Sequence, residues 1–120
     1  MSQTTRPPGK TTIAPNVLLT IARLTALDVP GVSHMYEIPG GVNRIFQRGY
    51  EEGVRIRIEE DRVYADLHVA LDHNVNMREV SRNVQNAVSR AISEMVGMEV
   101  GRVNVHIEDI HFTTTSDSED

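Results

Sequence analysis

The sequence has no cysteine and no tryptophan among its 120 residues. Without cysteine it can form neither a disulfide framework nor a thiolate zinc site, and it has no cysteine nucleophile. No apolar run approaches the roughly 20 residues that a membrane-spanning helix needs, and the opening "MSQTTRPPGK" lacks the apolar core of a signal peptide. We therefore expect a soluble, cytoplasmic protein with no transmembrane segment, which reaches a membrane only through a partner or a surface contact.

Lysine is nearly absent as well, since Lys10 is the only one and every other basic residue is arginine. The net charge is −5, and an acidic chain repels a phosphate backbone on average, which disfavours general nucleic-acid binding. A chain of this length fits one domain. Because both ends are polar and poor in apolar residues, we expect disordered tails at 1–10 and 113–120, the second one acidic, around a single domain at 11–112.

Patterns that would indicate catalysis are missing too. The serines at 81, 89 and 93 lie on the polar side of a predicted helix, outside any G-x-S-x-G turn. The glycines of "PGG" and "RGYEEG" lack the spacing and the following lysine of a phosphate-binding loop. Adjacent acids such as Glu51 and Glu52 fall in predicted turns, where carboxylates are usually solvated. We therefore expect no enzyme, no catalytic residue and no cofactor.

Three segments show the alternation that is typical of strands. Apolar and polar residues alternate over 54–59 and again over 62–71, which predicts an antiparallel hairpin. Alternation returns over 103–112, but the apolar positions shift by one residue near Glu108 and Asp109. A β-bulge at that point would account for the shift.

Two segments are predicted to be helical. Over 77–96 the apolar residues recur at helical spacing, Asn76 and Glu79 can form a capping box, and Gly97 is a natural stop. Residues 13–31 predict a short strand that leads into a helix. The apolar stripe of that first helix consists of Val17, Leu18, Ile21, Ala22 and Leu24.

The resulting order is β-α-β-β-α-β, with a variable segment at 33–53 after the first helix. We predict an α+β two-layer domain in which two helices pack on one face of a small mixed β-sheet. The long helix mainly covers the sheet, because each buried Val, Ile or Met contributes about 1.5 to 3 kcal/mol, more than exposed arginines add to folding.

A histidine pattern marks the outer face of the predicted sheet. Strand parity places His68 and His106 on the same side as Asp66 and Glu108. If their strands are neighbours, these side chains could form a metal site. A solvated polar face is the simpler interpretation, because no compact motif such as H-E-x-x-H is present and the five-residue spacing of His106 and His111 matches no standard zinc motif. We therefore predict no metal site.

Two groups of residues are candidates for partner binding. A row of arginines at every fourth position lies on the exposed side of the long helix, where it could contact RNA, acidic lipid or an acidic protein, although Glu79 and Glu94 interrupt it. The segment "YEIPGGVNRIFQRGY" at 36–50 is either an interaction loop or packs its phenylalanine back onto the domain. The candidate residues are Arg44, Phe46, Arg48, Arg78, Arg82 and Arg90.

Several stretches, read in order, resemble the alkaline shock protein family of bacterial envelope stress-response proteins. They are "DVPGV", "GVRIRI", "VYADLHVAL", "NMREVSRNVQNAVSRAISEMVGMEV" and "VNVHIEDIHF", within about Ile13 to Phe112. The resemblance implies a non-enzymatic cytoplasmic protein of cell envelope homeostasis that self-associates and lies near the membrane by binding a membrane-anchored protein. It implies no catalytic residue.

The leading hypothesis is therefore an interaction or scaffold module of the envelope stress response. The alternative is a small RNA-binding module that uses the open sheet face or the arginine row of the long helix, because small α/β sheets with one open face often take that role. A metal-dependent enzyme is a more distant third possibility.

Overall fold

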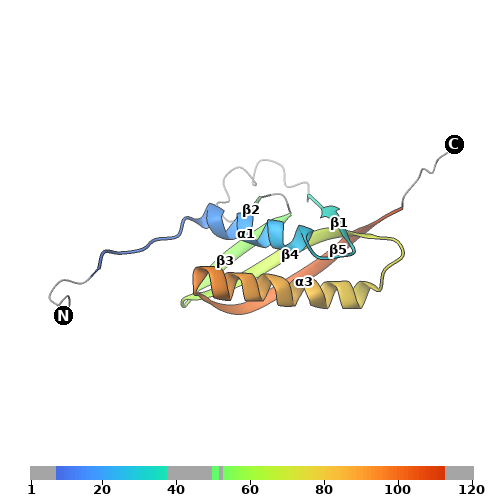
Figure 1. The fold of residues 1–120 in the computed structure, drawn as a ribbon. Helices are drawn as coiled ribbons and strands as arrows, with labels where there is room; N and C mark the ends of the chain where they lie inside the picture. The colour runs from blue at the N-terminus through green and yellow to red at the C-terminus, as the bar shows by residue number, and fades with distance from the viewer. Residues whose placement is uncertain (1–7, 38–49, 52, 113–120) are drawn as a thin grey trace.

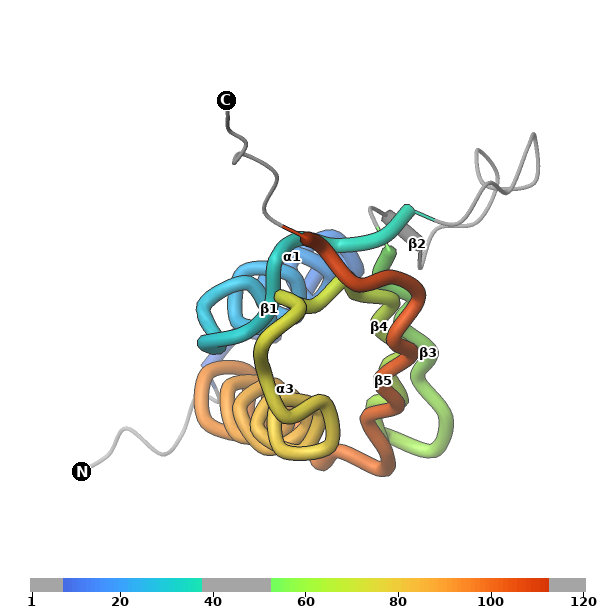
Figure 2. Tube along the Cα trace, turned by 90° about the vertical axis from the view of Figure 1, so that its right-hand side faces the viewer, coloured from blue at the N-terminus to red at the C-terminus, as the bar shows by residue number. Residues whose placement is uncertain are grey.

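The computed structural model describes residues 8–37, 50–51 and 53–112. Two helices cover one face of a five-stranded sheet (Figure 1). The elements are α1 (Pro15–Leu27), β1 (Val32–Met35), β2 (Tyr50–Glu51), β3 (Val54–Glu59), β4 (Arg62–Asp72), α3 (Met77–Ala91), the π-helical turn η2 (Ile92–Val96) and β5 (Glu99–His111). The two-layer arrangement is also visible along the sheet, with both helices on one side and β3, β4 and β5 on the other (Figure 2).

Strand β4 is the centre of the sheet. Along one edge it pairs in parallel with β5, and along the other it pairs antiparallel with β3 and then with β1. The short β2 extends the sheet beyond β3. The sheet is thus mixed and covered on one face by helices, which confirms the predicted α+β class.

The hairpin and the bulge predicted from the strand patterns are both present. β3 and β4 pair antiparallel, and Glu60 and Asp61 take positive φ values in the turn between them, as a tight hairpin turn requires. In the parallel β4–β5 ladder, Ile107 and Asp109 face consecutive residues of β4, so Glu108 is the extra residue of a bulge. Gly101 is the extra residue of a second bulge near the start of β5.

Helix α3 begins and ends where the sequence predicts. The side chain of Asn76 accepts a hydrogen bond of 3.0 Å from the backbone N–H of Glu79, which satisfies one of the free donors of the first turn. The helix continues through η2, and Gly97, with a φ of 81°, ends it by donating to the carbonyls of Ile92 and Ser93. The buried face consists of Val80, Val84, Val88 and Ile92.

The start of the domain differs from the prediction. Residues 8–14 form no strand, and the chain enters α1 directly at Pro15. The strand that follows α1, β1, lies in the segment that the sequence pattern left unassigned. The order of elements therefore begins α-β rather than β-α. Ile13, which was predicted to lie in a strand, is 40% exposed and belongs to no strand.

The buried side of helix α1 matches the predicted stripe only in part. Leu18 and Ala22 are buried as predicted, but Val17 and Leu24 are 43% and 53% exposed. Apolar residues occur on two opposite sides of this helix, and only one side can face the sheet. At the two ends of the long helix, Met77 of α3 and Met95 of η2 are likewise exposed. The rest of the α1 core side consists of Leu19 and Ala26.

The core lies between the helices and the inner face of β4. The alternate residues of β4 that point toward the helices are all fully buried, and they meet the valines of α3 and the leucines of α1 in one apolar cluster. No buried polar or charged side chain occurs in the described part of the chain. The fold therefore leaves polar chemistry to its two outer surfaces, which are the outer sheet face and the solvent side of the helix layer.

Candidate interaction surfaces

The outer sheet face holds the predicted histidine cluster. His68 and His106 pair across β4 and β5, and their rings stack at 4.6 Å between centroids. His68 Nδ1 lies 2.7 Å from Glu108 Oε2, and His106 Nε2 lies 3.1 Å from Asp66 Oδ1. Asn104 donates a further hydrogen bond of 3.0 Å to the same oxygen of Asp66. The parity argument therefore placed these side chains on the correct face.

Asp66 is the acid whose ionisation this cluster changes. Partial burial of the carboxylate alone would raise its pKa, but the hydrogen bonds from His106 and Asn104 and the charges of His106 and Arg55 outweigh burial. The pKa of Asp66 is therefore lowered from its usual value of 3.8. At neutral pH the carboxylate is ionised and serves as a hydrogen-bond acceptor.

The cluster has the geometry of two cross-strand pairs. Within residues 8–37, 50–51 and 53–112, no group of three or more His, Asp or Glu side chains is placed to hold a metal ion. Each imidazole instead directs one ring nitrogen to its own carboxylate, and the two rings lie parallel, so their nitrogens do not converge on one point. Such pairs hold the register of β4 against β5.

Further histidines lie beyond the predicted pair. His34 on β1 faces Ala70 of β4, and its ring contacts that of His111 edge-on at 5.9 Å. Ala70 is fully buried although it lies on the outer face of the sheet. His73 stacks on Phe112 at 5.0 Å. The sequence did not show these contacts, because the position of β1 beside β4 was not predicted.

Tyr64 is the aromatic side chain of β4 that an RNA base would need for stacking on this face. The guanidinium of Arg57 lies 4.7 Å above the ring centroid. The ring also lies against Gly101, where an added Cβ would come within 2.5 Å of two ring carbons. The tyrosine is therefore already packed between a cation and a glycine, which weighs against base stacking here.

The arginine row of α3 lies on the solvent side of the helix layer. Arg78, Arg82 and Arg90 are all exposed. Arg90 donates to Glu94 at 3.1 Å in an exposed pair four residues apart, which contributes little to stability. Arg78 and Arg82 form no ion pair with any described residue. The loop candidates Arg44, Phe46 and Arg48 lie outside the described residues.

Helix α1 adds an apolar stripe to the same side, and sequence reasoning missed it. Val17, Leu24 and Leu27 are 43%, 53% and 37% exposed, and Thr20, also exposed, lies between them. The spacing of 3, 4 and 3 residues is that of a helix-packing seam. The spacing of these residues is visible in the sequence, but helical spacing alone cannot show which of the two apolar sides of α1 faces the sheet. We call Val17, Thr20, Leu24 and Leu27 the α1 stripe.

The two helices lie side by side over one sheet face (Figures 1 and 2), so the α1 stripe and the exposed arginines of α3 belong to one outward surface. We call this surface the helix-layer face. It combines apolar side chains with two cations, Arg78 and Arg82, that form no ion pair with a described residue, while Arg90 pairs with Glu94. No helix among the described residues is both long and apolar enough to cross a membrane.

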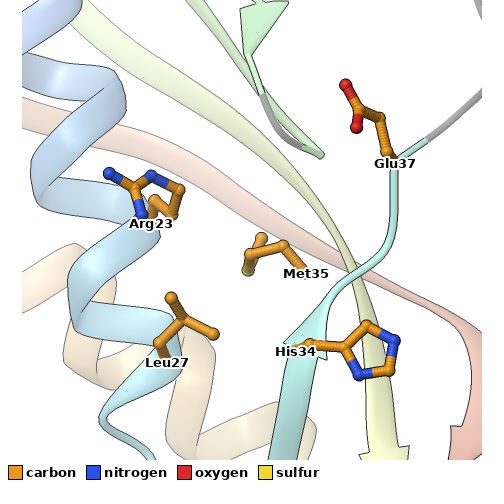
Figure 3. A pocket seen from close by; sticks show the side chains of 5 residues that line it. All are labelled: Arg23, Leu27, His34, Met35 and Glu37. Atoms are coloured by element: carbon orange, nitrogen blue, oxygen red, sulfur yellow. The ribbon is translucent and has the colours of Figure 1, made fainter.

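A pocket of about 280 Å³ lies where α1 approaches β1 (Figure 3). This volume is at the low end for a small-molecule site. The lining residues are Arg23, Leu27, His34, Met35 and Glu37.

Comparison with known proteins identifies similar chains. The sequence model of the alkaline shock protein 23 family, described by a cell envelope-related function, matches residues 3–112. The uncharacterized protein YqhY of Bacillus subtilis (strain 168) is 29% identical over 108 residues, which cover 88% of this chain and 80% of YqhY. The uncharacterized protein Spy1535 of Streptococcus pyogenes serotype M6 is 33% identical over 105 residues, 85% of this chain and 79% of that protein.

Among solved structures, the copper form of MamM CTD has a TM-score of 0.55 at 17% sequence identity, covering 88% of this chain and 92% of that one. At this level of identity the likeness concerns the fold alone. It agrees with the α+β two-layer architecture described above.

Proposed function

The chain belongs to the alkaline shock protein 23 family, which is related to the cell envelope, and we propose that it is a non-enzymatic interaction module of the envelope stress response. In this proposal the protein self-associates and a protein partner brings it to the membrane. The observation that carries the proposal is the helix-layer face, which combines the α1 stripe with the exposed arginines of the neighbouring helix α3.

The α1 stripe supports binding because it is costly to leave in water. Fully burying a leucine or valine side chain is worth about 1.5 to 3 kcal/mol, and three such side chains on α1 remain more than a third exposed. Contiguous apolar surface rimmed by charge is typical of protein-binding sites. The matching partner would present apolar side chains next to acidic ones, which meet Arg78 and Arg82.

The outer sheet face supports the non-enzymatic part of the proposal. Its histidines and carboxylates bond to each other across β4 and β5, as side chains that stabilise a sheet do. A catalytic acid or base would instead need to face a substrate position. The RNA-binding alternative gains no support from this face, since the ring of Tyr64 is occupied by Arg57 and Gly101.

A pull-down from detergent-solubilised membranes tests the proposal. Leu24→Ser removes the centre of the α1 stripe, and Arg82→Glu reverses an exposed cation on the neighbouring helix α3. Each should reduce recovery of the partner at least about tenfold, because changing a hot-spot residue near the centre of an interface costs about 2 kcal/mol or more. The captured protein, identified by mass spectrometry and purified, should show the same loss when it is mixed with the variants alone. Phe46→Ala in the same assay tests the predicted loop contact.

Met95→Ser is the matched control for the apolar change, since Met95 is 70% exposed but lies outside the α1 stripe. Arg55→Glu, on the outer sheet face, is the control for the charge change. Undiminished recovery by Leu24→Ser and Arg82→Glu would refute the helix-layer face as the binding site. RNA binding that weakens steeply with added salt would instead favour the alternative function.

A further inference from the structure

Strand β5 forms a long open edge of the sheet. It spans 13 residues from Glu99 to His111 and pairs in parallel with β4. No described residue pairs with its other edge. An edge strand presents a row of backbone N–H and C=O groups to which a further strand can bond. A strand that pairs with this edge must match the length, the side chains and the charges of β5.

The two bulges mark the ends of the regular part of β5. Gly101 and Glu108 are the extra residues, and between them Arg102 to Ile107 pair residue by residue with Tyr64 to Val69 of β4. This stretch offers an evenly spaced ladder of backbone groups, and Glu108 directly follows it with its side chain on the outer face, where it contacts His68. A partner strand of about the same length would match it, and the chain itself carries one.

We propose that two copies of the chain pair their β5 strands antiparallel about a two-fold axis at Val105. The two sheets then become one continuous sheet with all helices on the same side. This inference rests on the self-association in the proposed function and specifies its surface. A two-fold interface brings the same patch of both copies together, so the patch must be complementary to itself.

The side chains of β5 meet that requirement in this register. On the helix side, Val105 faces Val105 of the partner subunit, and Val103 faces Ile107 of the partner subunit. Ile107 is 36% exposed in the single chain, so pairing would cover it. On the outer side, Asn104 faces His106 of the partner subunit.

Charge distinguishes this register from its neighbours. With the axis at Val105, Arg102 faces Glu108 of the partner subunit, and this contact occurs twice. Arg102 has no ion pair with a described residue, and Glu108 bonds His68 through Oε2 alone. An axis at Asn104 would instead place Arg102 opposite His106 of the partner subunit. A shift by one residue would put the apolar side chains of the two copies on opposite faces.

The charges and bulges of β5 also explain why the edge would not pair indiscriminately. Edge strands are commonly guarded by charged side chains and bulges. Here Arg102 and Glu108 are complementary in the two-fold register at Val105, whereas an axis at Asn104 leaves both without a charged partner of opposite sign. Specificity that combines one favourable arrangement with penalties for others is typical of selective interfaces.

Disulfide cross-linking tests the register directly, because the natural chain contains no cysteine. Val105→Cys should form a covalent dimer on mild oxidation, since residues on the axis face each other at a distance that a disulfide can span. Val103→Cys alone is the matched control, because its two copies would lie four residues apart, about 13 Å along the strands. A mixture of Val103→Cys and Ile107→Cys chains should cross-link to each other.

Charge reversal gives a second measurement that needs no cysteine. Arg102→Glu and Glu108→Arg should each weaken dimerisation about tenfold, because each places like charges opposite one another at two symmetric sites. The double variant should restore dimerisation by exchanging the pair. Circular dichroism confirms that each variant is folded, and the restoration separates the interface effect from the loss of the Glu108–His68 contact.

The outcomes separate the β5 interface from self-association in general. If the unmodified chain exceeds its 13.4 kDa monomer mass in sedimentation but no Val105→Cys dimer forms and Arg102→Glu changes nothing, the β5 interface is wrong and another surface self-associates. If the unmodified chain sediments as a monomer, both the β5 interface and self-association fall. Partner recovery in the membrane pull-down would still stand on its own.

Discussion

Single residues on the outer sheet face stabilise the join between β4 and β5 through charge. Asp66 accepts from His106 and Asn104, both on β5, while the residue itself lies on β4. Burial works against the ionised form, yet the pKa of Asp66 falls because these donors and nearby cations favour the carboxylate. Protonation of Asp66 therefore weakens the pairing of β4 with β5, which is the longest strand pair of the sheet.

Replacing Asp66 by asparagine should lower the free energy of unfolding at pH 7 by about 1 kcal/mol, because hydrogen bonds to a charged acceptor are lost. Since the folded pKa lies below the unfolded one, the contribution is complete above about pH 4 and disappears as the pH falls through the folded pKa. Urea unfolding of the natural chain and Asp66→Asn at pH 7 and pH 3 measures this. Asp61→Asn, in an exposed turn, is the control. An equal difference at both pH values would contradict the account.

Substitution of two glycines distinguishes the cost of a strained backbone from the cost of a steric clash. Gly53 and Gly97 have nearly the same φ, 82° and 81°, but an added Cβ at Gly53 would lie 2.8 Å from the carbonyl oxygen of Tyr36, whereas nothing lies within 4 Å at Gly97. Gly97→Ala should cost about 1 kcal/mol of stability from strain alone. Gly53→Ala should cost about 1 kcal/mol more, because backbone atoms must move. Equal losses in thermal unfolding would show that the contact at Gly53 is unimportant.

Helices and strands with one strong periodicity were predictable from the sequence. In α3 the cap at Asn76 and the stop at Gly97 agree with a single apolar face, and each feature alone would place the helix. The buried side of helix α1 was predicted only in part, because its apolar residues lie on two sides and helical spacing cannot rank them: Leu18 and Ala22 are buried as predicted, but Val17 and Leu24 are exposed. Strand β1 was missed because it is only four residues long, with no alternation to mark it.

A pair of leucines on α1 tests this assignment of sides. Leu18 is 1% exposed and Leu24 is 53% exposed. Leu18→Ala should cost about 2 to 5 kcal/mol of unfolding free energy through lost burial and a cavity. Leu24→Ala should cost less than about 1 kcal/mol, because its side chain is already half in water. Chemical denaturation of both variants measures this, and a large loss at Leu24 would make the α1 stripe a structural rather than a binding feature.

At the scale of the whole molecule, the two layers were predictable from the sequence, but which strands pair with one another was not. Strand parity placed His68 and His106 on one face, yet only the parallel pairing of β4 with β5 brings their rings together. That pairing joins segments about 40 residues apart in the chain, and no local pattern encodes it. For the same reason the helix-layer face, which combines α1 with α3, could not be assembled from the arginine row alone.

The most direct test of the account is the size of the purified chain in solution, measured by sedimentation velocity alone and with solubilised membrane extract. We predict a species larger than the 13.4 kDa monomer in both cases and a further increase with extract. Leu24→Ser and Arg82→Glu should lose the second increase and keep the first. A natural chain that stays monomeric in buffer and is unchanged by the extract would contradict the claim that the protein acts by recognition through its surfaces.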